Sequence, residues 1–492
     1  MLLQSNNALS EVENETSVIN MRQMKTAAFF PDGVGIRNFV LGSFLDRAAD
    51  LGEVYAFHDI PEQHLDEYKK TENDRVHWKQ CIPYRDEPLV RFLRRSLSHA
   101  HLYLNDTMAM RYARKMPVRG NKRSRIQTYA SRAYGWMSAS PHRIGKLLQW
   151  HDREAAKLAS VDEYVKLFEE IRPTVLFCSH QRCLEVIPAA LAARSMGIPT
   201  ATFIFSWDNI TSKGRIAAPF DHFLVWSNQM RDELLQYYPE VNGENIHVVG
   251  TPQFDPYADE SLVWSREEFC RQVGADPARP IICYSGGEPG TTPEDQNHVR
   301  VLMELVSSGR IKGNPQVLLR PAPVTRADER VRYGDVCRDY PELIYSKPRW
   351  LQTIPGDWTS VIPSRDDIQL LANLTKHVDL NINVASTMTL DFAIRDKPVV
   401  NIGFNTMSPP PFGVPLKDYY YKFEHYRPVV EMGAARFAGT PDELAEHVNA
   451  YLNDPSLDRD KRRQFVEFEL DLPIGRSSDK ITQVLQRISA KN

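Results

Sequence analysis

The stretch from residue 373 to 404, NLTKHVDLNINVASTMTLDFAIRDKPVVNIGF, constrains the fold more than any other part of this chain. An apolar, alternating run over 378–384 is followed by a small polar turn over 385–387 and by a short helical segment that contains Asp391. A second apolar run covers 399–404. Because alternation of period two is typical of strands, the stretch is expected to form a β–turn–α–β unit, the building block of parallel sheets.

The turn of this unit offers two hydroxyl groups at the start of a helix. Ser386 and Thr387 lie where the first helical amides have no partner inside the helix and where the helix dipole is positive. Such a turn is suited to bind an anion, for example a phosphate. The alternative is an ordinary βαβ unit in which Ser or Thr only caps the helix. The stretch alone leaves both interpretations open.

The same order of elements recurs along the chain. A strand over 25–31, a helix over 36–51 and a strand over 53–58 form the first unit. Further strands are expected at 173–178, 200–205, 221–226, 246–249, 281–284 and 316–320. This pattern predicts an α/β fold of two doubly wound parallel-sheet halves of similar size, joined near residue 250.

Charge and cysteine content narrow the class of protein. The 60 Lys and Arg against 63 Asp and Glu give a formal net charge of −3, which argues against a chain made to wrap nucleic acid. The six cysteines are scattered without a CxxC pair, as expected of a reduced, cytosolic protein without a zinc site. No apolar run approaches the roughly 20 residues that span a bilayer. The polar, acidic residues 1–23 are expected to be a loosely ordered tail rather than a signal peptide.

Residues from about 86 to 160 interrupt the strand–helix rhythm with a helical insertion in which aromatic residues lie among many cations. The basic residues that mark it are Arg111, Arg114, Lys115, Arg119, Lys122, Arg123 and Arg125. Three interpretations stay open: a solvated helical face with a mobile loop, a contact with an anionic membrane surface, or a grip on an anionic acceptor. No nucleic-acid-binding motif is present in this region.

A turn with two glycines follows the first strand. Gly33 and Gly35 would let the backbone approach a ligand at the carboxyl edge of the sheet. Asp32 precedes them and is either a catalytic base that faces a cleft or the cap of the next helix. Arg37 and Asn38, at the start of that helix, are candidates for contact with an acceptor or a phosphate.

Further candidates for a base follow later strands of the first half. His180 could titrate near neutral pH, although a single His at a strand end also serves as a hydrogen-bonded wall. Asp208 lies in a polar loop close to Lys213, so that an ion pair competes with a catalytic role. Glu185 is a weaker candidate. Asp32 and Asp208 are preferred over His180, and a retaining mechanism would need no such base.

The layout and three segments of the second half resemble the GT-B glycosyltransferase fold. The segments are Ser-Gly-Gly at 285–287, the Leu-Arg-Pro-Ala-Pro sequence around Arg320, and 386–393 with the Lys-Pro pair at 397–398. In GT-B enzymes the last segment usually carries small residues near the donor phosphates and a Glu that binds the donor ribose; here Asp391 takes the acidic position. The resemblance implies donor-binding roles for Ser285, Gly286, Gly287, Arg320, Ser386, Thr387, Thr389 and Asp391.

The resemblance also implies how the domains divide the work. Residues 24–250 would form a Rossmann-like acceptor domain with the helical insertion, and 251–465 a Rossmann-like nucleotide-sugar donor domain across a cleft. The helix over 466–492 is expected to pack back on the N-terminal domain. On the acceptor side the resemblance places Gly33, Gly35, Arg37, Asn38 and Lys213, and the catalytic candidates Asp32, Asp208 and His180.

Two narrower resemblances point to different substrates. The Ser-Thr…Asp-Phe-Ala…Lys-Pro pattern is similar to that of CDP-glycerol glycerophosphotransferases, which share the GT-B architecture and move a polyol phosphate. Those enzymes usually carry Arg-x-His-Pro, whereas this chain has Arg-Pro-Ala-Pro at 320–323. In the first half, FSWDNITSKG at 205–214, with 224–226 and 248–255, resembles bacterial surface-carbohydrate glycosyltransferases.

Together these resemblances imply a glycosyltransferase that moves a sugar from a nucleotide-sugar donor to a cell-surface glycan, polysaccharide or lipid-linked acceptor. The alternatives are a CDP-polyol phosphotransferase of the teichoic-acid type, a UDP-sugar 2-epimerase-like enzyme and a non-catalytic GT-B scaffold. Asp366 and Asp367 are expected to begin a helix rather than to form a metal-binding DxD motif, so no metal and no other cofactor is expected. The protein is expected to be cytoplasmic, with peripheral contact to an anionic membrane. No nucleic-acid partner is expected.

Overall fold

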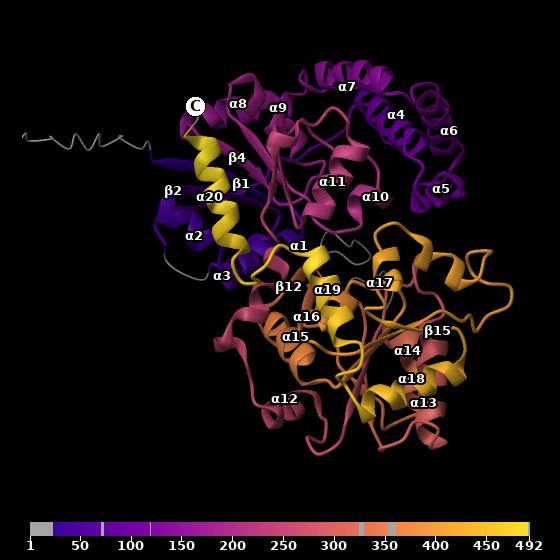
Figure 1. The fold of residues 1–492 in the computed structure, drawn as a ribbon. Helices are drawn as coiled ribbons and strands as arrows, with labels where there is room; N and C mark the ends of the chain where they lie inside the picture. The colour runs from indigo at the N-terminus through magenta and orange to yellow at the C-terminus, as the bar shows by residue number, and fades with distance from the viewer. Residues whose placement is uncertain (1–22, 70–72, 119, 324–328, 353–360, 491–492) are drawn as a thin grey trace, which may run out of the picture.

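The computed structural model describes residues 23–69, 73–118, 120–323, 329–352 and 361–490 (Figure 1). The chain forms two α/β halves, each built around a parallel sheet, and this confirms the predicted fold class. Residues 1–22 of the predicted tail lie outside the described part of the chain.

The first half contains a seven-stranded sheet in the order β3-β2-β1-β4-β5-β6-β7, with every neighbouring pair parallel. In chain order the strands are β1 (Met24–Phe30), β2 (Gly52–His58), β3 (Val76–Gln80), β4 (Val175–Cys178), β5 (Thr200–Phe203), β6 (His222–Val225) and β7 (Ile246–Val248). The central strands are buried on both faces, as parallel sheets covered by helices require. The sequence gives no apolar signal for β3, because it is a polar edge strand.

The second half contains a six-stranded parallel sheet in the order β10-β9-β8-β13-β14-β15, and a two-stranded antiparallel ribbon. The strands of the sheet are β8 (Ile281–Ser285), β9 (Gln316–Arg320), β10 (Ile344–Tyr345), β13 (Leu380–Asn383), β14 (Val399–Ile402) and β15 (Arg436–Ala438), and those of the ribbon are β11 (Trp350–Gln352) and β12 (Val361–Pro363). The four strands predicted for this half are present, and the short edge strands β10 and β15 were not predicted.

Helices cover both faces of each sheet (Figure 1). Those of the first half are α1 (Gly33–Gly35), α2 (Phe44–Leu51), α3 (Glu62–Tyr68), α8 (Ala159–Ile171), α9 (Ile187–Ser195), α10 (Asn209–Ser212) and α11 (Asn228–Tyr237). Those of the second are α12 (Arg266–Val273), α13 (Asp295–Ser307), α14 (Glu329–Asp339), α15 (Arg365–His377), α16 (Met388–Ile394), α17 (Arg427–Glu431), α18 (Pro441–Asn453) and α19 (Arg459–Glu469).

The helix predicted over 36–51 is not continuous. Its first part is a π-helical turn, Ile36–Val40, in which the Leu41 amide donates to the Ile36 carbonyl at 2.9 Å. A bend at 41–43 separates this turn from α2. The apolar spacing is the same on both sides of the bend, so periodicity alone could not reveal it. π-helical turns are frequent at functional sites, and this one faces the second half of the molecule.

The predicted helical insertion consists of α4 (Pro88–Leu104), α5 (Met108–Lys115), α6 (Lys122–Met137) and α7 (Pro141–Ala155), which form one edge of the first half (Figure 1). Helix α6 packs closely on α4 because small residues face inward. A Cβ atom added at Gly135 would lie 2.6 Å from the Cβ of His99 and 2.8 Å from the Ser96 carbonyl oxygen. Glycine at this position therefore permits the close approach of the two helices.

The last helix, α20 (Ser477–Ser489), leaves the second half and lies along the first, beside α2 (Figure 1). Asp479 pairs with Arg47 of α2 at 3.0 Å, and the Ser489 hydroxyl donates to Thr174 at 2.7 Å. Among the helices of the described residues, none combines the length and the apolar content needed to cross a membrane.

Candidate functional site

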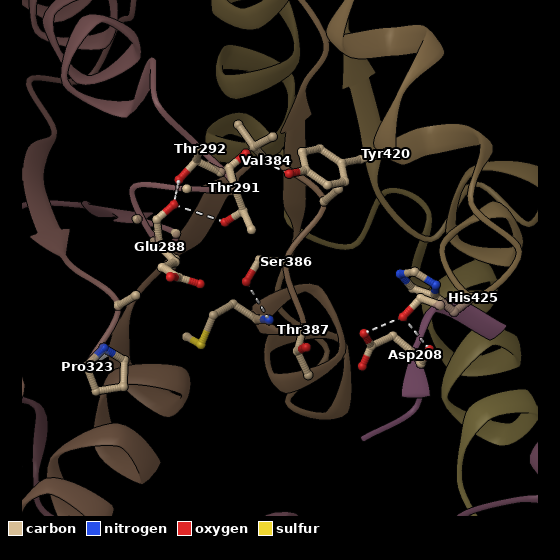
Figure 2. Close-up of a pocket in the computed structure, with 18 of the residues that line it drawn as sticks. Asp208, Glu288, Thr291, Thr292, Pro323, Val384, Ser386, Thr387, Tyr420 and His425 are labelled. Carbon is tan, nitrogen blue, oxygen red and sulfur yellow. Dashed lines mark hydrogen bonds between the residues drawn. The ribbon is translucent and has the colours of Figure 1, made fainter. Parts of the chain in front are cut away.

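A cavity of about 650 Å³ lies between the two halves. Its volume is in the range of small-molecule and cofactor sites, and it opens where the carboxyl ends of both sheets face each other. Figure 2 shows Ser386 and Thr387 on one wall and Asp208 and His425 on another. Both halves contribute to the lining, so a ligand in this cavity would contact two domains at once.

The wall from the second half is built by three adjacent strands. Ser285 ends β8, Arg320 ends β9, and Ser386 and Thr387 follow β13, which is the neighbour of β8 on its other side. All four residues line the cavity together with Gly286 and Gly287. Because parallel strands place their carboxyl ends at one edge, segments that are 100 residues apart in sequence converge here.

Arg320 is held by a carboxylate that sequence reasoning assigned to a helix start only. Its Nη2 donates to both oxygens of Asp367, at 2.8 and 2.9 Å, and the two side chains are buried. Asp367 lies in the first turn of α15, as predicted, but its side chain turns to the cavity and also accepts from the Arg349 amide and the Trp350 indole. The Arg320 Nη1 is buried and has no hydrogen-bond partner among the described residues.

The two glycines of the 285–287 segment allow a tight loop, but their backbone amides are already hydrogen-bonded to other protein groups and are not free to bind a ligand. The Gly286 amide donates to the Arg320 carbonyl at 2.9 Å, and the Gly287 amide donates to Asp295 at 2.7 Å. A Cβ added at Gly287 would lie 2.6 Å from the Thr292 hydroxyl oxygen. The glycines let this loop fold tightly against the cavity.

Behind the 385–387 turn lies a network of buried amides that sequence reasoning missed. Asn383 accepts from the Ser386 amide at 3.0 Å and from Asn401 at 3.0 Å, and its own amide group donates to Asn381 at 2.7 Å. Thr389, predicted to bind the donor, is fully buried in this network, not at the cavity. Asparagines at consecutive inward positions of buried strands are the signal that could have revealed it.

Asp391 also lies beneath the cavity wall. The Tyr257 hydroxyl, from the segment Pro252–Ala258 that joins the two halves, donates to its carboxylate. Burial raises the pKa of Asp391 to about 6, although Tyr257 and Arg37 counteract the shift. Asp391 is therefore not among the residues that line the cavity, and its carboxylate is already bound to a tyrosine.

Three residues of the first half reach the cavity as expected: Arg37, Asp208 and Lys213. Burial lowers the pKa of Arg37, and the carboxylates of Asp391 and Asp367 across the domain boundary oppose this shift. Asn38 is buried and accepts from the Arg37 Nε at 2.9 Å, so it orients the arginine rather than lining the cavity.

Asp208 is the cavity carboxylate of the first half. Burial would raise its pKa, but the ammonium of Lys213 at 3.3 Å, the ring of His425 and hydroxyl donors hold the pKa of Asp208 below its usual value. The predicted ion pair with Lys213 is therefore present. Asp208 also accepts from the Ser212 hydroxyl at 2.9 Å.

His425, from the second half, is a cavity residue that sequence reasoning missed. Burial lowers its pKa to about 4, so the imidazole is neutral at physiological pH. It lies against Trp207, with ring centroids 5.9 Å apart, and next to Thr211. A neutral imidazole beside a carboxylate can accept a proton from a bound hydroxyl.

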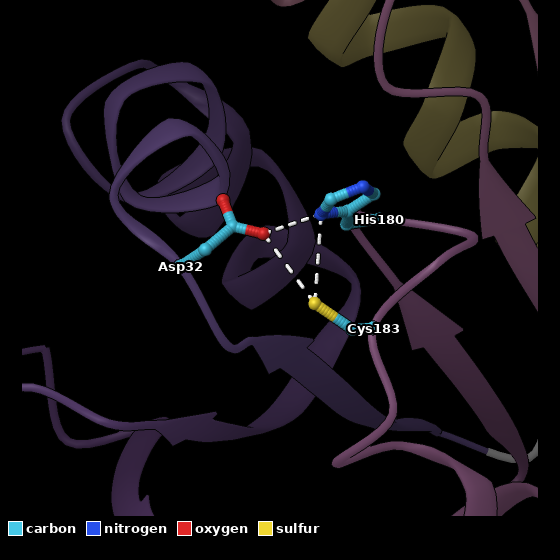
Figure 3. Close-up of side chains that lie close together, drawn as sticks. All are labelled: Asp32, His180 and Cys183. Carbon is cyan, nitrogen blue, oxygen red and sulfur yellow. Dashed lines mark hydrogen bonds and ion pairs between the residues drawn. The ribbon is translucent and has the colours of Figure 1, made fainter. Parts of the chain in front are cut away.

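Asp32 and His180 are not among the residues that line the cavity. They lie close together with Cys183 (Figure 3). The carboxylate of Asp32 caps α1 by accepting from the Val34 and Gly35 amides at 3.0 and 2.8 Å, and contacts His180 Nδ1 at 2.5 Å. Burial opposes the charge, but His180 and the backbone donor hold the pKa of Asp32 below its usual value. The capping interpretation thus holds in the structure.

The same three side chains are of the types that bind transition metals. One ligand atom from each of Asp32, His180 and Cys183 lies within 4.8 Å of the others. However, two ligands of a tetrahedral zinc ion at ordinary bond lengths are about 3.3 Å apart, and the Asp32–His180 distance of 2.5 Å is that of a hydrogen bond. Burial raises the pKa of the Cys183 thiol, which disfavours the thiolate that a metal would bind.

Gly33 and Gly35 pack against protein rather than facing the cavity. A Cβ added at Gly33 would lie 1.7 Å from the carbonyl oxygen of Val361 in the ribbon of the second half. One added at Gly35 would lie 2.4 Å from the Ser179 hydroxyl. The close backbone approach predicted for these glycines is therefore made to the other domain and to a neighbouring loop.

An aromatic cluster closes one end of the cavity. Tyr112 of α5 contacts Tyr419 and Phe423 of the second half, with ring centroids 4.5 and 6.1 Å apart. Phe412 stacks on Tyr419 at 4.4 Å, and these rings line the cavity. The helical insertion and the segment at 405–428 thus contact each other at the cavity, across the boundary between the two halves.

No family model and no curated protein matches this chain in sequence. Solved structures resemble it in fold. A UDP-N-acetylglucosamine 2-epimerase matches with a TM-score of 0.51 and 12% identity over 94% of this chain and 96% of the other. A glycosyltransferase from Rickettsia africae matches with 0.50 and 10% over 95% and 98%. A UDP-N-acetylglucosamine 2-epimerase from Rickettsia bellii matches with 0.50 and 9% over 95% and 96%. The two parallel-sheet domains and the cleft between them are the GT-B architecture.

Proposed function

We propose that this protein is a glycosyltransferase that moves a sugar from a nucleotide-sugar donor to a glycan or lipid-linked acceptor without a metal ion. The observation that carries the proposal is Arg320. A guanidinium group is rarely buried without a full set of partners, because unpaired buried donors are unfavourable. Arg320 lines a cavity of suitable size. Its Nη1 is buried without a partner among the described residues, so this guanidinium has a donor left that an anion could satisfy.

The other groups of the donor wall support a diphosphate at this place. Ser285, Ser386 and Thr387 bring hydroxyl groups to the same cavity, and Arg37 adds a second cation from the opposite half. Preorganised donors and cations of this kind stabilise the charge that develops on a leaving diphosphate, and no metal is needed for it. Closure between two domains would also hold donor and acceptor in one orientation.

The opposite wall carries groups suited to an acceptor hydroxyl. Asp208 and His425 lie in the cavity from different halves, and both are unprotonated at neutral pH because the pKa of each is lowered. The lowered pKa also makes each a weaker base than the free side chain, so their support for the role of base comes from their position. Lys213 keeps Asp208 ionised. Of the two bases preferred from the sequence, Asp208 is kept and Asp32 is set aside, because neither Asp32 nor His180 is among the residues that line the cavity. His425 is added beside Asp208.

A 2-epimerase that acts on a UDP-sugar is the second candidate. Two of the similar solved structures bear that name. The observation in this chain that favours it is the group of Asp208, Asp367 and His425 around one cavity, since inversion at a sugar carbon needs proton acceptors and donors but no acceptor substrate. The two candidates differ in whether a second substrate is consumed.

A nucleotide panel tests the proposal. The full-length protein is incubated with UDP-, GDP-, CDP- and dTDP-sugars and with a CDP-polyol, and binding is followed by calorimetry and thermal shift. We expect one nucleotide-sugar to bind and its nucleoside diphosphate to be released only when a glycan acceptor is added. Formation of the 2-epimer without acceptor supports the second candidate, and turnover of the CDP-polyol supports a phosphotransferase. Absence of nucleotide binding across the panel contradicts all enzymatic interpretations.

A further inference from the structure

Helix α6 buries small residues and exposes large apolar ones. Its buried face carries small residues, with Ser131 and Gly135 against α4. Its outer face carries Ile126, Tyr129 and Trp136, whose side chains are 69%, 52% and 67% exposed. In a surface helix of a globular protein the large apolar residues normally face the core. Among the described residues, nothing covers these three side chains on the outer face of α6.

The exposed apolar residues form one continuous stripe. Positions 126, 129, 133, 136 and 137 are spaced by three or four residues or adjoin, which places them on one side of a helix. Met137 is 50% exposed, and Met116, at the end of α5, is 58% exposed. Met116 lies beside α6, because its carbonyl accepts from the Arg132 guanidinium of that helix at 2.9 Å. We call this set of side chains, Met116, Ile126, Tyr129, Trp136 and Met137, the α6 stripe.

The surroundings of the α6 stripe are strongly cationic. Residues 107–151 contain ten Lys and Arg and no Asp or Glu, although the whole chain has a net charge of −3. Lys122, Arg123 and Arg125 are exposed at the start of α6, and Arg143 and Lys146 are exposed on α7. A merely solvated helical face accounts for the cations but not for large apolar side chains set among them.

We propose that the α6 stripe docks on the surface of an anionic phospholipid bilayer. The apolar side chains would enter the boundary between headgroups and acyl chains, and the flanking cations would contact lipid phosphates. Trp and Tyr are favoured at this depth of a membrane. A second copy of this chain is disfavoured as the occupant, because docking two such faces would bring two cationic surfaces together.

The placement of the α6 stripe connects it to the cavity. Met116 lines the cavity and is also part of the stripe, and α5, which precedes it, forms part of the cavity wall. Docking therefore brings one side of the cavity to the lipid surface. From this we infer that the acceptor is carried on a membrane lipid. This extension rests on the proposed glycosyl transfer, whereas the docking proposal does not depend on it.

The test is flotation of the full-length protein with phosphatidylcholine vesicles, with and without phosphatidylglycerol, at low and high salt. We expect flotation only with the anionic vesicles and its loss at high salt. The double variant I126S/W136S should lower the partition coefficient at least about tenfold, because it removes two apolar side chains from the interface. The matched control is V430S/L472S, which changes exposed apolar residues of the second half and should float like the wild type.

Equal flotation with both kinds of vesicle, absence of flotation, or an unchanged I126S/W136S variant would overturn the proposal. So would a gel shift with nucleic acid, or a dimer in light scattering, that the variant abolishes without any vesicle binding. Nucleotide binding is measured on the same samples. Flotation without nucleotide binding retains the docking site and removes the lipid-linked acceptor. Nucleotide binding without flotation removes both the docking site and the lipid-linked acceptor that was inferred from it, and leaves the proposed glycosyl transfer in place.

Discussion

The Nη2 group of Arg320 donates hydrogen bonds to both carboxylate oxygens of Asp367, at 2.8 and 2.9 Å. The Nη1 group is buried without a partner among the described residues. Both side chains line the cavity, and the pair neutralises the charge of a buried carboxylate. The guanidinium keeps one donor that no described residue satisfies. Arg320 is therefore the first residue whose replacement should be measured.

R320A should weaken nucleotide-sugar binding about 10- to 100-fold, since hydrogen bonds to charged groups contribute about 1.5–3 kcal/mol. The affinity of R320K for the nucleotide-sugar should lie between those of R320A and the wild type, because lysine keeps the charge and loses the forked geometry. Calorimetry measures both. The control is R310A, which changes an exposed arginine of the same half.

The buried carboxylate left by R320A is a source of instability that could imitate a binding defect. The double variant R320A/D367N removes this uncompensated charge, so its fold should recover while its affinity stays low. Wild-type affinity in a folded R320A protein would place the donor phosphates elsewhere in the cavity.

The burial of Asp391, which raises the pKa of its carboxyl against the opposing effect of Tyr257, predicts a pH dependence of stability. The unfolded carboxyl titrates near 3.8 and the folded one at about 6, so the folded state keeps a proton that the unfolded state has lost between these pH values. The stability from this group is present below about pH 4 and is lost as the pH rises through about 6. D391N cannot titrate. The difference in the free energy of unfolding between D391N and the wild type should therefore grow in favour of D391N as the pH rises from about 4 to about 6. The growth should be about 3 kcal/mol, which corresponds to a shift of about two pKa units.

Chemical unfolding of both proteins at several pH values measures this difference. The isosteric amide still accepts from the Tyr257 hydroxyl, so the fold is kept. D335N, at an exposed carboxyl of α14, should follow the wild-type curve at every pH. A constant offset between D391N and the wild type from pH 4 to 7 would contradict the prediction.

The regular part of the fold could be read from the sequence because buried parallel strands are apolar on both faces. The strands β8, β13 and β14 are fully buried. In the sequence β8 and β14 stand out as mostly apolar runs between turn signals, and β13 as an alternation of apolar residues and asparagines. The edge strands β3 and β15 are partly exposed and carry polar residues, so they have no such signal. The carboxyl ends of the predicted strands then indicated which residues of the second half line the cavity, because parallel topology gathers these ends at one edge.

Side-chain direction could not be read in this way. Asp391 and Thr389 lie on the predicted helix, but they point away from the cavity, and their partners Tyr257 and Tyr426 are 134 and 37 residues away in sequence. His425 lies in an irregular segment without periodicity, so no pattern directed attention to it. Long-range pairs of this kind are set by packing between domains, which local sequence does not encode.

Gly33 is predicted to be essential for the contact between the halves. A methyl group there would meet the Val361 carbonyl at 1.7 Å, and neither backbone can give way easily. G33A should lower the free energy of unfolding by about 1–3 kcal/mol, as overpacking usually does. G145A is the matched control, because a Cβ at Gly145 of α7 meets nothing within 4 Å and should stabilise the helix slightly. Urea unfolding midpoints compare them, and equal stability of G33A and wild type would contradict the close approach.

Activity is predicted to be independent of metal. The Asp32–His180 contact of 2.5 Å is a hydrogen bond, and burial raises the pKa of the Cys183 thiol. Elemental analysis of the purified protein should therefore find no stoichiometric zinc, and a chelator should leave donor binding and turnover unchanged. One equivalent of zinc that the C183S variant loses would instead identify these three side chains as a metal site.

Asp208 is predicted to take the proton of the acceptor hydroxyl, with His425 beside it. Because general-base catalysis contributes about 10²- to 10⁴-fold, D208N should lower kcat by that factor and leave nucleotide affinity within about twofold. Asp208 lines the cavity from the half opposite the donor wall, which is why binding and turnover should separate. D32N is the informative contrast: it removes a buried carboxylate that caps α1 and contacts His180, so it should reduce stability while the folded fraction keeps its kcat. Steady-state kinetics with the donor found in the panel measures both variants. Full activity of D208N together with an inactive, folded D32N would return the role of base to Asp32 and His180.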